Sequence, residues 1–362
     1  MTDHEQPAPA RTGFFTRILE DAPAADRYRF ALEQIETAER FGHASAWVAQ
    51  HHFHEHEGGL PSPFVLLAAA ASRTSTIALA TGVVTLPIDD PLRAAEDASV
   101  LDAISGGRVQ LGVAAGGTPS SFPPFGRDAA DRRTVFADHL DVFTDALAGR
   151  GIRGTDATLY PPADGLVDRL WEGTFSVGGG TRAGAAGHGL MLSRSQPRPD
   201  RTPDLLLHDL QLPIVDAYRA ALPQGAPYRV LASRSAVVVD EPDRTRVLEE
   251  AEPHLRRFAA TIVGPDRAAE LDLDGLVRVT DTHVGTVDEV VASLARDETL
   301  TVATDVTFQV HSVEPRHETT LRSIELLATE VAPRLGLATG PDAAAALRDA
   351  HRTRTRTPER TA

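Results

Sequence analysis

A cluster of histidines is the part of this sequence with the clearest capacity for chemistry. His51, His52, His54 and His56 lie in one short segment that follows an apolar run near Trp47. A neutral imidazole can ligate a metal ion, and its ordinary pKa also suits it to proton transfer near neutral pH. Three interpretations are open: a metal site, one or two histidines that face a non-metal active site, or roles in packing and at the surface.

The metal interpretation lacks its usual supporting features. Barrel hydrolases with a His-x-His metal pair normally carry it after the first strand, whereas this cluster follows the second predicted strand. Lysine and cysteine are both absent, which excludes carbamylated-lysine bridges, Schiff bases, disulfides and thiolate chemistry. The remaining chemistry must come from other polar side chains or from a bound cofactor.

A glycine-rich segment is the second candidate. Gly178, Gly179 and Gly180, followed by Thr181, come after an apolar run and open a short predicted helix. Backbone N–H groups at such a helix end, together with the threonine hydroxyl, can bind a phosphate. Arg133, at the start of another predicted helix, could add a guanidinium. The alternative for the glycine segment is a flexible strand-to-helix turn, and the alternative for Arg133 is a solvated arginine.

Other residues could serve either function or structure. Arg93 with Glu96 or Asp97 could supply catalytic charges, although a structural ion pair is the favoured interpretation. Several glycines occur where strands are expected to end, and these permit either close approach of a flat ligand or a tight turn: Gly82, Gly112, Gly116 and Gly117.

The elements that must position these residues repeat about every 32 residues, which is about the length of a βαβ unit. Strand-like runs begin near Thr12, Ser45, Thr76 and Arg108. Four more strands are predicted, at residues 173–177, 189–193, 229–239 and 300–310. Eight mostly parallel strands that alternate with helices favour a (β/α)8 TIM barrel, in which residues just past the strand ends form the active face.

Helices and an insertion fill the intervals between these strands. Asp90 is a predicted N-cap, with Pro91 as the first helical residue. Residues 118–168 interrupt the repeat after strand 4 and could form a lid. The remaining helices are predicted at residues 26–41, 62–73, 130–147, 205–222, 243–262, 286–296 and 318–334.

Composition limits the partners. The formal net charge of −15 argues against nucleic acid, because phosphate neutralisation requires excess cations. The N-terminus does not resemble a signal peptide, and no apolar segment reaches the roughly 18 residues of a spanning helix. We therefore expect a cytoplasmic protein without membrane contact.

Several motifs taken together show that the chain closely resembles the bacterial luciferase-like, flavin-dependent monooxygenase family between Gly13 and Gly336. The motifs are Trp47-Val-Ala-Gln-His-His-Phe, Leu86-Pro with Asp90-Pro-Leu-Arg-Ala-Ala-Glu-Asp, Leu101-Asp-Ala-Ile-Ser-Gly-Gly-Arg-Val-Gln-Leu-Gly-Val, and Phe125-Gly-Arg-Asp with Arg133 downstream. We accordingly divide the chain into a flexible N-terminus (1–11), a luciferase-like TIM-barrel domain (12–336) and a flexible basic C-terminal tail (337–362).

The resemblance implies a barrel that holds FMN at the C-terminal strand ends, usually in a homodimer packed through helices of the first half. By position, His51 matches the catalytic histidine beside the flavin, and His52 is a supporting candidate. Arg133 and Thr181 match contacts to the FMN phosphate. The other residues of the predicted cofactor site are Gly82, Ala114, Gly178, Gly179, Gly180 and Ser193.

Two departures from luciferase affect this site. Gln50 stands where luciferase has glutamate, and Ala114 with Ala115 replaces a cysteine and a phosphate-binding arginine. Losing that arginine should weaken phosphate binding, for which backbone donors of Gly178 to Gly180 could compensate.

The implied activity is that of a two-component monooxygenase. A separate reductase supplies reduced FMN, which reacts with O2 to a C4a-hydroperoxyflavin and oxygenates a small organic substrate, while His51 donates or relays a proton. The alternatives are a deazaflavin (F420)-dependent oxidoreductase on the same fold, a metal-dependent TIM-barrel hydrolase and a non-catalytic flavin-binding protein. The sequence names no substrate and implies no light emission.

Overall fold

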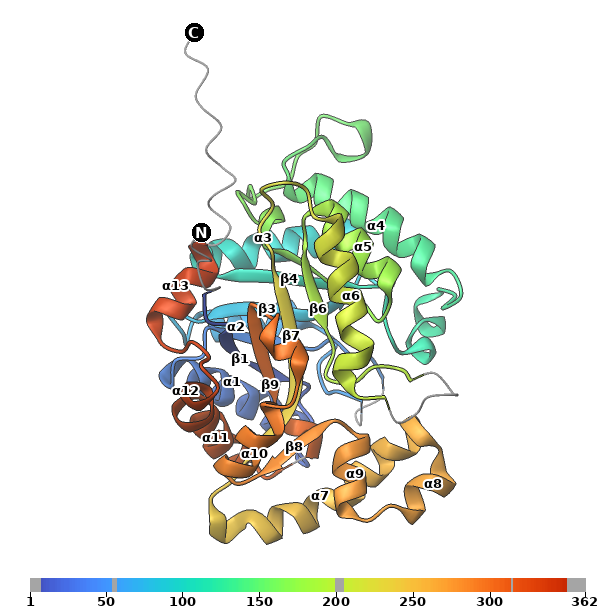
Figure 1. Ribbon diagram of the computed structural model, residues 1–362. Helices are drawn as coiled ribbons and strands as arrows, with labels where there is room; N and C mark the ends of the chain where they lie inside the picture. Colours follow the sequence, from blue (N-terminus) through green and yellow to red (C-terminus); the bar gives the residue numbers. More distant parts are fainter. Residues whose placement is uncertain (1–7, 54–56, 199–204, 314, 350–362) are drawn as a thin grey trace, which may run out of the picture.

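Eight parallel β-strands close into a barrel at the centre of the molecule. The computed structural model describes residues 8–53, 57–198, 205–313 and 315–349 (Figure 1). Each strand pairs with the next around the ring, and pairing of the last with β1 closes it. The barrel strands are β1 (Arg11–Thr16), β2 (Ser45–Val48), β3 (Ala78–Thr85), β4 (Val109–Ala114), β5 (Leu170–Gly173), β6 (Gly189–Leu192), β7 (Val230–Val238) and β9 (Asp305–Gln309). The predicted (β/α)8 barrel is confirmed.

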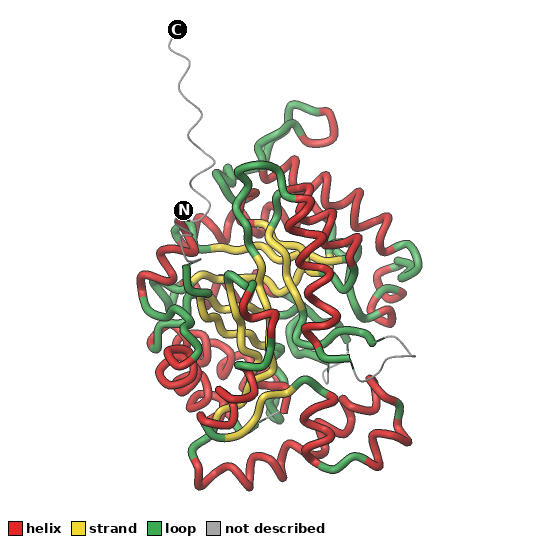
Figure 2. Tube along the Cα trace, viewed as in Figure 1, coloured by secondary structure: helices red, strands yellow, loops and turns green. Residues whose placement is uncertain are grey.

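Helices surround this barrel, as Figure 2 shows. The α-helices are α1 (Ala24–Arg40), α2 (Pro63–Ala71), α3 (Pro91–Ser105), α4 (Arg132–Leu147), α5 (Val177–Ala186), α6 (Leu207–Ala221), α7 (Arg244–Val263), α8 (Pro265–Glu270), α9 (Leu273–Val279), α10 (Val287–Leu294), α11 (His317–Leu326), α12 (Ala332–Arg334) and α13 (Pro341–Asp349). Short 3-10 helices are η1 (Pro119–Ser121), η2 (Pro123–Phe125), η3 (Ile152–Gly154), η4 (Val167–Arg169), η5 (Glu241–Asp243), η6 (Glu298–Thr301) and η7 (Val310–Val313), and a π-helical turn, η8 (Leu327–Val331), follows α11.

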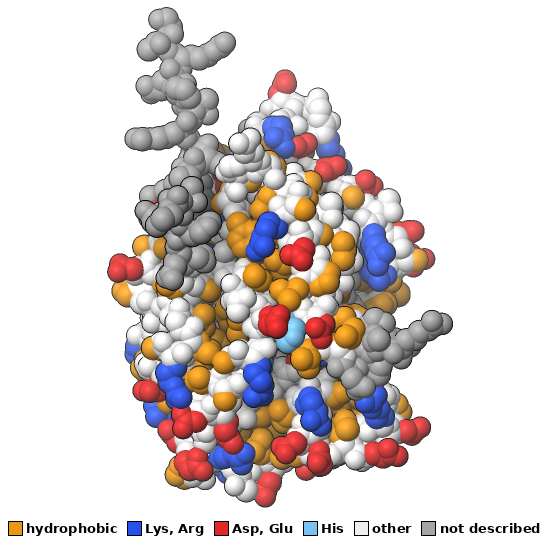
Figure 3. Space-filling model, in the orientation of Figure 1, with side chains coloured by type: hydrophobic (Ala, Val, Ile, Leu, Met, Phe, Trp, Pro, Cys, Tyr) orange, Lys and Arg blue, Asp and Glu red, His pale blue; other side chains and the backbone are white. Residues whose placement is uncertain are grey.

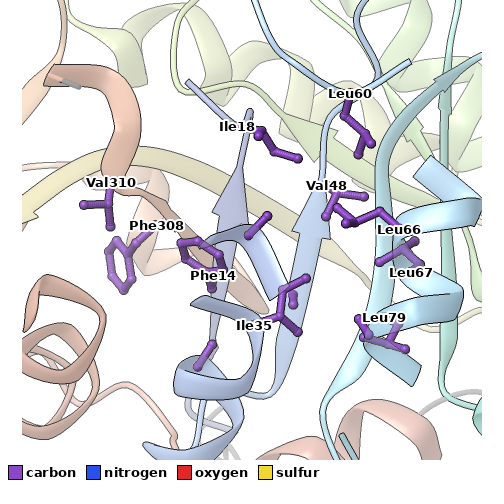
Figure 4. Close-up of a cluster of buried hydrophobic side chains, with 14 of the residues drawn as sticks. Phe14, Ile18, Ile35, Val48, Leu60, Leu66, Leu67, Leu79, Phe308 and Val310 are labelled. Carbon is purple, nitrogen blue, oxygen red and sulfur yellow. The ribbon is translucent and has the colours of Figure 1, made fainter. Parts of the chain in front are cut away.

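Alternation along the strands builds two apolar layers, because successive side chains of a strand point to opposite faces. Phe14 belongs to the layer between barrel and helices, where it pairs with Phe308 of β9, and the two rings lie near each other in Figure 4. The next residue, Phe15, belongs instead to the barrel interior. Trp47 and Trp171 meet edge to face in that interior, with ring centroids 5.7 Å apart. The strands are therefore buried on both faces.

Helix α3 shows how the local sequence fixes an element. The carboxylate of Asp90 accepts hydrogen bonds from the backbone N–H groups of Leu92 (2.9 Å) and Arg93 (3.2 Å), as the N-cap prediction requires. Gly106 ends the helix in the left-handed conformation, with φ of 69°. The Arg93 side chain pairs with Asp97 at 3.3 Å on the exposed face, and also with Glu96, so these charges form a structural ion pair.

Helix α13 lies where sequence reasoning placed a flexible tail starting at residue 337. Ala338 forms a parallel bridge with Arg11, and Ala343 and Ala344 of the helix pack against Ala44 at the start of the second repeat. Leu347 is fully buried within the cluster that fills the barrel interior. The ordered fold therefore extends beyond the predicted boundary, because alanine and leucine side chains of this segment cover apolar surface. Residues 1–7 and 350–362 lie outside the described residues.

Shortening Leu347 should destabilise the fold. We expect Leu347→Ala to lower the free energy of unfolding by about 2–4 kcal/mol, because it removes buried methyl groups and leaves a cavity. Urea denaturation followed by far-UV circular dichroism measures the change. An unchanged midpoint would show that α13 does not stabilise the barrel in solution.

Three local predictions were wrong. The fifth strand was predicted at residues 173–177, but β5 ends at Gly173 and helix α5 begins at Val177, because Ser176 acts as an N-cap. The last strand was predicted from residue 300, but it starts at Asp305, since η6 occupies the preceding residues. The helix predicted at residues 318–334 is interrupted by the π-helical turn η8.

A small lobe at the end of β7 was not predicted. The second half of β7 continues past the barrel and pairs with an extra strand, β8 (Thr282–Gly285). Figure 1 shows α7, α8 and α9 beside β8 at the bottom of the view. This lobe therefore extends the barrel at the C-terminal ends of its strands.

The surface carries both signs of charge. On the face shown in Figure 3, acidic and basic side chains are interspersed and no large basic patch is visible. Among the described residues, no helix combines the length and apolarity needed to cross a membrane.

Candidate active site at the C-terminal rim of the barrel

The predicted site residues follow neighbouring strands, and parallel pairing brings the ends of these strands to one rim. The residues are His51 and His52 after β2, Gly82 in β3, Ala114 at the end of β4, Gly178 to Thr181 after β5, and Ser193 after β6. In barrels of this kind that rim is where active sites are built. The structure thus brings together residues that are far apart in the sequence.

His51 is held in a partly buried position beside this rim. Its backbone N–H donates to the carbonyl of Leu60 at 2.9 Å. Its ring lies so close to Gly58 that a Cβ there would be 2.5 Å from Cδ2. Burial, and then the positive charge of Arg17 and the neighbouring His52 and Arg194, lowers the pKa of His51 to about 3. The imidazole is therefore neutral at pH 7, with one N–H to donate and one lone pair.

His52 presents an unsatisfied polar atom at the same place. Its Nε2 is buried and has no hydrogen-bond partner among the described residues. Its ring meets that of Phe125, from the insertion, edge to face at 4.9 Å. Thr118, at the start of the insertion, donates a hydrogen bond to the carboxylate of Glu57 at 2.8 Å. The insertion therefore packs over the histidine segment.

The structure describes two of the four clustered histidines, His51 and His52. His54 and His56 lie outside the described residues. Within the described ranges, no group of three or more His, Asp or Glu side chains has an arrangement that could hold a metal ion.

The first turn of α5 presents hydrogen-bond donors. Ser176 caps the helix by accepting from Gly179 N–H at 3.1 Å, and the first intrahelical bond runs from Gly180 N to Ser176 O. The N–H groups of Val177 and Gly178 precede that bond and have no partner within the helix. A Cβ at Gly178 would meet no atom within 4 Å, so this turn is open. It can accept an anion.

Arg133 is the residue predicted to add a guanidinium to this turn. It occupies the first turn of α4 and is exposed. One turn further along, Phe136 of α4 contacts α5, since the guanidinium of Arg182 lies 5.0 Å from its ring centroid. The two helices therefore pack against each other near their first turns, which is the arrangement that the predicted role of Arg133 requires. Thr181, also exposed, donates its hydroxyl to Val177 O at 3.2 Å.

Two of the three consecutive glycines have a packing role. A Cβ at Gly180 would lie 2.6 Å from the backbone oxygen of Ile214 in α6, and one at Gly179 would lie 1.9 Å from Thr174 Oγ1. Glycine is needed at position 180 because α5 and α6 approach closely, and at position 179 because Thr174 occupies the space of a side chain. The predicted phosphate role therefore rests on Gly178 and the helix end rather than on all three glycines.

Gly180→Ala should consequently lower the free energy of unfolding by about 1–3 kcal/mol, since the neighbouring atom is backbone and must shift. Gly178→Ala is the matched control, because its Cβ enters open space. Thermal or urea unfolding of both variants tests the difference. Equal stabilities would contradict the packing role.

Gly82 allows the β3 backbone to approach the barrel interior. A Cβ at this position would be 2.6 Å from the ring of Phe15. The peptide bond between Gly82 and Val83 is cis, at the point where the register between β3 and β4 shifts. Ala114 ends β4 and is partly buried.

Comparison with known proteins identifies this arrangement. The sequence model described as luciferase-like monooxygenase matches residues 10–304, which is most of the chain. The protein belongs to the luciferase-like monooxygenase family.

Named members of the family match different lengths of the chain. Limonene 1,2-monooxygenase of Rhodococcus erythropolis is 28% identical over 324 residues, covering 86% of this chain and 82% of that protein. 4-Hydroxyprotoasukamycin monooxygenase of Streptomyces nodosus subsp. asukaensis is 43% identical, but the match spans only 33% of this chain and 32% of that protein. The oxygenase component of a flavin-dependent trigonelline monooxygenase from Acinetobacter baylyi is 31% identical over 28% of each chain.

Solved structures share the fold. Monooxygenase RslO1 from Streptomyces bottropensis superposes with a TM-score of 0.73 at 24% identity, covering 90% of this chain and 99% of that one. The oxygenating constituent of 3,6-diketocamphane monooxygenase from Pseudomonas putida, in complex with FMN, gives 0.72 at 19% identity over 91% and 99%. An F420-dependent secondary alcohol dehydrogenase gives 0.66 at 19% identity over 90% and 99%.

Gln50 has a positioning function in this family member that sequence reasoning did not find. Its amide Nε2 donates to Asp89 Oδ2 at 3.0 Å, and its Oε1 accepts from Thr85 N–H at 2.7 Å. The side chain thus ties the histidine segment to the end of β3. The sequence identified this position only as a departure from luciferase.

Arg194 is a second residue that sequence reasoning missed. It follows β6 directly after Ser193, whose carbonyl accepts from Gln211 Nε2 at 2.7 Å. Arg194 is 8% exposed, donates to Ser235 Oγ at 3.3 Å, and lies over the ring of Phe258 at 4.6 Å. The available signal was a charged residue just past the end of a strand.

Proposed function

We propose that the protein is the oxygenase component of a two-component monooxygenase, which takes reduced FMN from a separate flavin reductase and oxygenates a small organic substrate with O2. The observation that carries this proposal is the presence, on one rim, of two neutral, partly buried imidazoles and an open helix N-terminus. These two features suit the ring and the phosphate of one flavin nucleotide. The relative named as an oxygenase component supports the separate reductase.

The residues present fit FMN at both ends. The N–H groups of Val177 and Gly178, with Thr181 and the guanidinium of Arg133, would hold the phosphate. The small side chains of Ala114 and Ser193 would leave space for the flat ring, beside the Gly82 backbone, against which Phe15 packs. Bound reduced FMN would supply the two electrons that activate O2, so that one oxygen atom enters the substrate and the other leaves as water.

The protein's own task is to position groups and to exclude water. His51 is neutral at pH 7, because burial and the nearby positive charges lower its pKa to about 3. It can therefore donate one hydrogen bond and accept another, and so move a proton only if both partners are in place. Phe125 packs over His52 and would shield this segment from solvent.

An F420-dependent oxidoreductase is the second candidate function. Ala115 stands where an additional phosphate-binding arginine is expected, which weakens the case for FMN. The fold is also shared by an F420-dependent alcohol dehydrogenase. In that case the same rim would support hydride transfer without O2.

Anaerobic titration calorimetry with reduced FMN, oxidised FMN and reduced F420 separates these functions. We expect reduced FMN to bind, and Arg133→Gln to weaken its binding by about tenfold through loss of a charge-assisted contact. Arg29→Gln, which alters an exposed pair with Asp26, is the control. Binding of F420 without binding of FMN would contradict the proposal.

We also propose a homodimer that packs through α2 and α3. Val65, Val100 and Ile104 on these helices are 73%, 44% and 57% exposed, which is unusual for large apolar side chains in a monomer. Val65→Asp combined with Ile104→Asp should convert a dimer to a monomer in sedimentation velocity experiments. A double variant that remains dimeric would place the interface elsewhere.

A further inference from the structure

Arg194 is a buried cation with no acidic partner among the described residues. Its guanidinium has one hydrogen bond, to the Ser235 hydroxyl, and one ring contact, with Phe258. Removing a guanidinium from water is costly unless an anion or good hydrogen bonds compensate. The chain carries a formal charge of −15, so acids are abundant, yet in the part of the chain that the structure describes none forms an ion pair with this arginine.

The nearby aspartates are already engaged. Asp281 forms a bidentate pair with Arg198, at 2.8 and 2.6 Å, in a largely buried position. Asp297 pairs with Arg234, whose side chain is fully buried. These two pairs are neutral, so the positive charge of Arg194 is left over.

A second arginine adds to this positive field at the mouth of the barrel. Arg17 follows β1, and its guanidinium donates to the backbone oxygen of Glu57, beside the histidine segment. Burial, and then the charge of Arg17, lowers the pKa of Arg194 to about 9, although the negative charge of Asp281 acts in the opposite direction. The charges of both arginines also lower the pKa of His51. The three side chains therefore share one electrostatic environment.

From this arrangement we propose that Arg194, with Arg17 and Ser235, binds the carboxylate of an anionic organic substrate next to His51. The proposal rests on the proposed function for its catalytic meaning and names the substrate class of that site. The Phe258 ring covers one face of the guanidinium, leaving its edge, where the remaining N–H donors are, free to form a planar two-point contact.

The flavin phosphate does not account for this cation. The Arg194 side chain extends toward Ser235 in β7 and Phe258 in α7. The phosphate donors lie instead on the first turns of α4 and α5. The competing occupant is therefore the ring of reduced flavin, which can carry negative charge, and the test must separate it from a carboxylate.

The probes are acetate, benzoate and decanoate, with benzamide as the neutral counterpart of benzoate. Calorimetry on the full chain at pH 7, with and without oxidised FMN, should show binding of at least one carboxylate and at least tenfold weaker binding of the amide. Arg194→Gln should weaken binding of the carboxylate by at least tenfold. Arg194→Lys should weaken it by less, since lysine keeps the positive charge but lacks the planar guanidinium. Arg29→Gln should change nothing.

Circular dichroism and thermal unfolding establish that each variant is folded, and Ser235→Ala provides a milder second variant. A shift of the His51 imidazole resonance on adding the carboxylate, absent in His51→Gln, would place the anion beside His51 without any turnover measurement.

Two results would overturn the proposal. One is that no carboxylate binds, or that binding is equal in Arg194→Gln. The other is that Arg194→Gln weakens binding of reduced FMN by more than tenfold while leaving binding of carboxylates unchanged. That result would show that the arginine contacts the flavin ring. If carboxylates bind as expected but reduced FMN neither binds nor reacts differently with O2, the subsite stands and the proposed monooxygenase function fails.

Discussion

Replacing His51 by alanine should shorten the delay between addition of O2 and appearance of oxidised FMN by about a hundredfold, the usual effect of removing one positioned hydrogen-bond donor. The imidazole is neutral at pH 7, so its contribution is a fixed N–H beside the flavin rather than a positive charge. His51→Gln retains an N–H donor of similar reach and should recover part of the delay. Rapid-mixing absorbance measures all three proteins.

The control for this prediction is His188→Gln, which changes a histidine that directly precedes β6, at the opposite end of the barrel from the rim. It should leave the delay unchanged. The affinity for reduced FMN should change by less than about threefold in both His51 variants, because one neutral hydrogen bond contributes only modestly to binding. If His51→Ala binds flavin normally and reoxidises it at the wild-type rate, His51 has no role in the reaction.

Removing the carboxylate of Asp297 should be among the most destabilising single changes in the chain. Asp297 pairs with Arg234, whose side chain is fully buried and also donates to Gln211 Oε1 at 2.9 Å. Asp297→Ala would leave that guanidinium buried without a counter-charge, which typically costs about 3–5 kcal/mol. Urea unfolding at pH 7 measures the loss.

The exposed pair of Asp26 with Arg29 gives the matched comparison, where Asp26→Ala should lower the free energy of unfolding by less than about 1 kcal/mol.

The stability loss in Asp297→Ala should also depend on pH. Burial raises the pKa of Asp297, but the charge and hydrogen bond of Arg234 outweigh burial and hold it below its ordinary value. The pair therefore stabilises the fold fully at pH values above the ordinary aspartate pKa. This stabilisation is lost as the pH falls through the lower pKa that Asp297 has in the folded protein. Equal losses for Asp297→Ala and Asp26→Ala would contradict the account.

The barrel could be predicted because its signals are local and repeated. Strand-like runs recur at the length of a βαβ unit, and Asp90 with Pro91 marks a helix start that the structure reproduces. The lobe of β8, α8 and α9 has no such signal, since its elements are short and β8 is stabilised by pairing with the extension of β7. Helix α13 was missed because its side chains are buried by segments distant in the sequence, which are Ala44 and strands β1 and β3.

The site residues remain predictions from the sequence, and only their placement in the fold has been observed. His51, His52 and Arg133 were identified by position, and the parallel topology explains how strand ends bring such residues to one rim. The environment of a side chain could not be predicted, because it depends on contacts between distant segments. The pKa of His51 is lowered first by burial and then by the charges of residues that include Arg17 and Arg194, which are 34 and 143 positions away in the numbering.

The central claim is that this rim binds reduced FMN and controls its reaction with O2. The most direct test mixes the anaerobic complex of protein and reduced FMN with O2 in a stopped-flow spectrometer and follows the flavin absorbance. We predict two phases, in which oxidised FMN appears only in the second and more slowly than from free flavin. A single phase at the rate of free reduced FMN would contradict the claim.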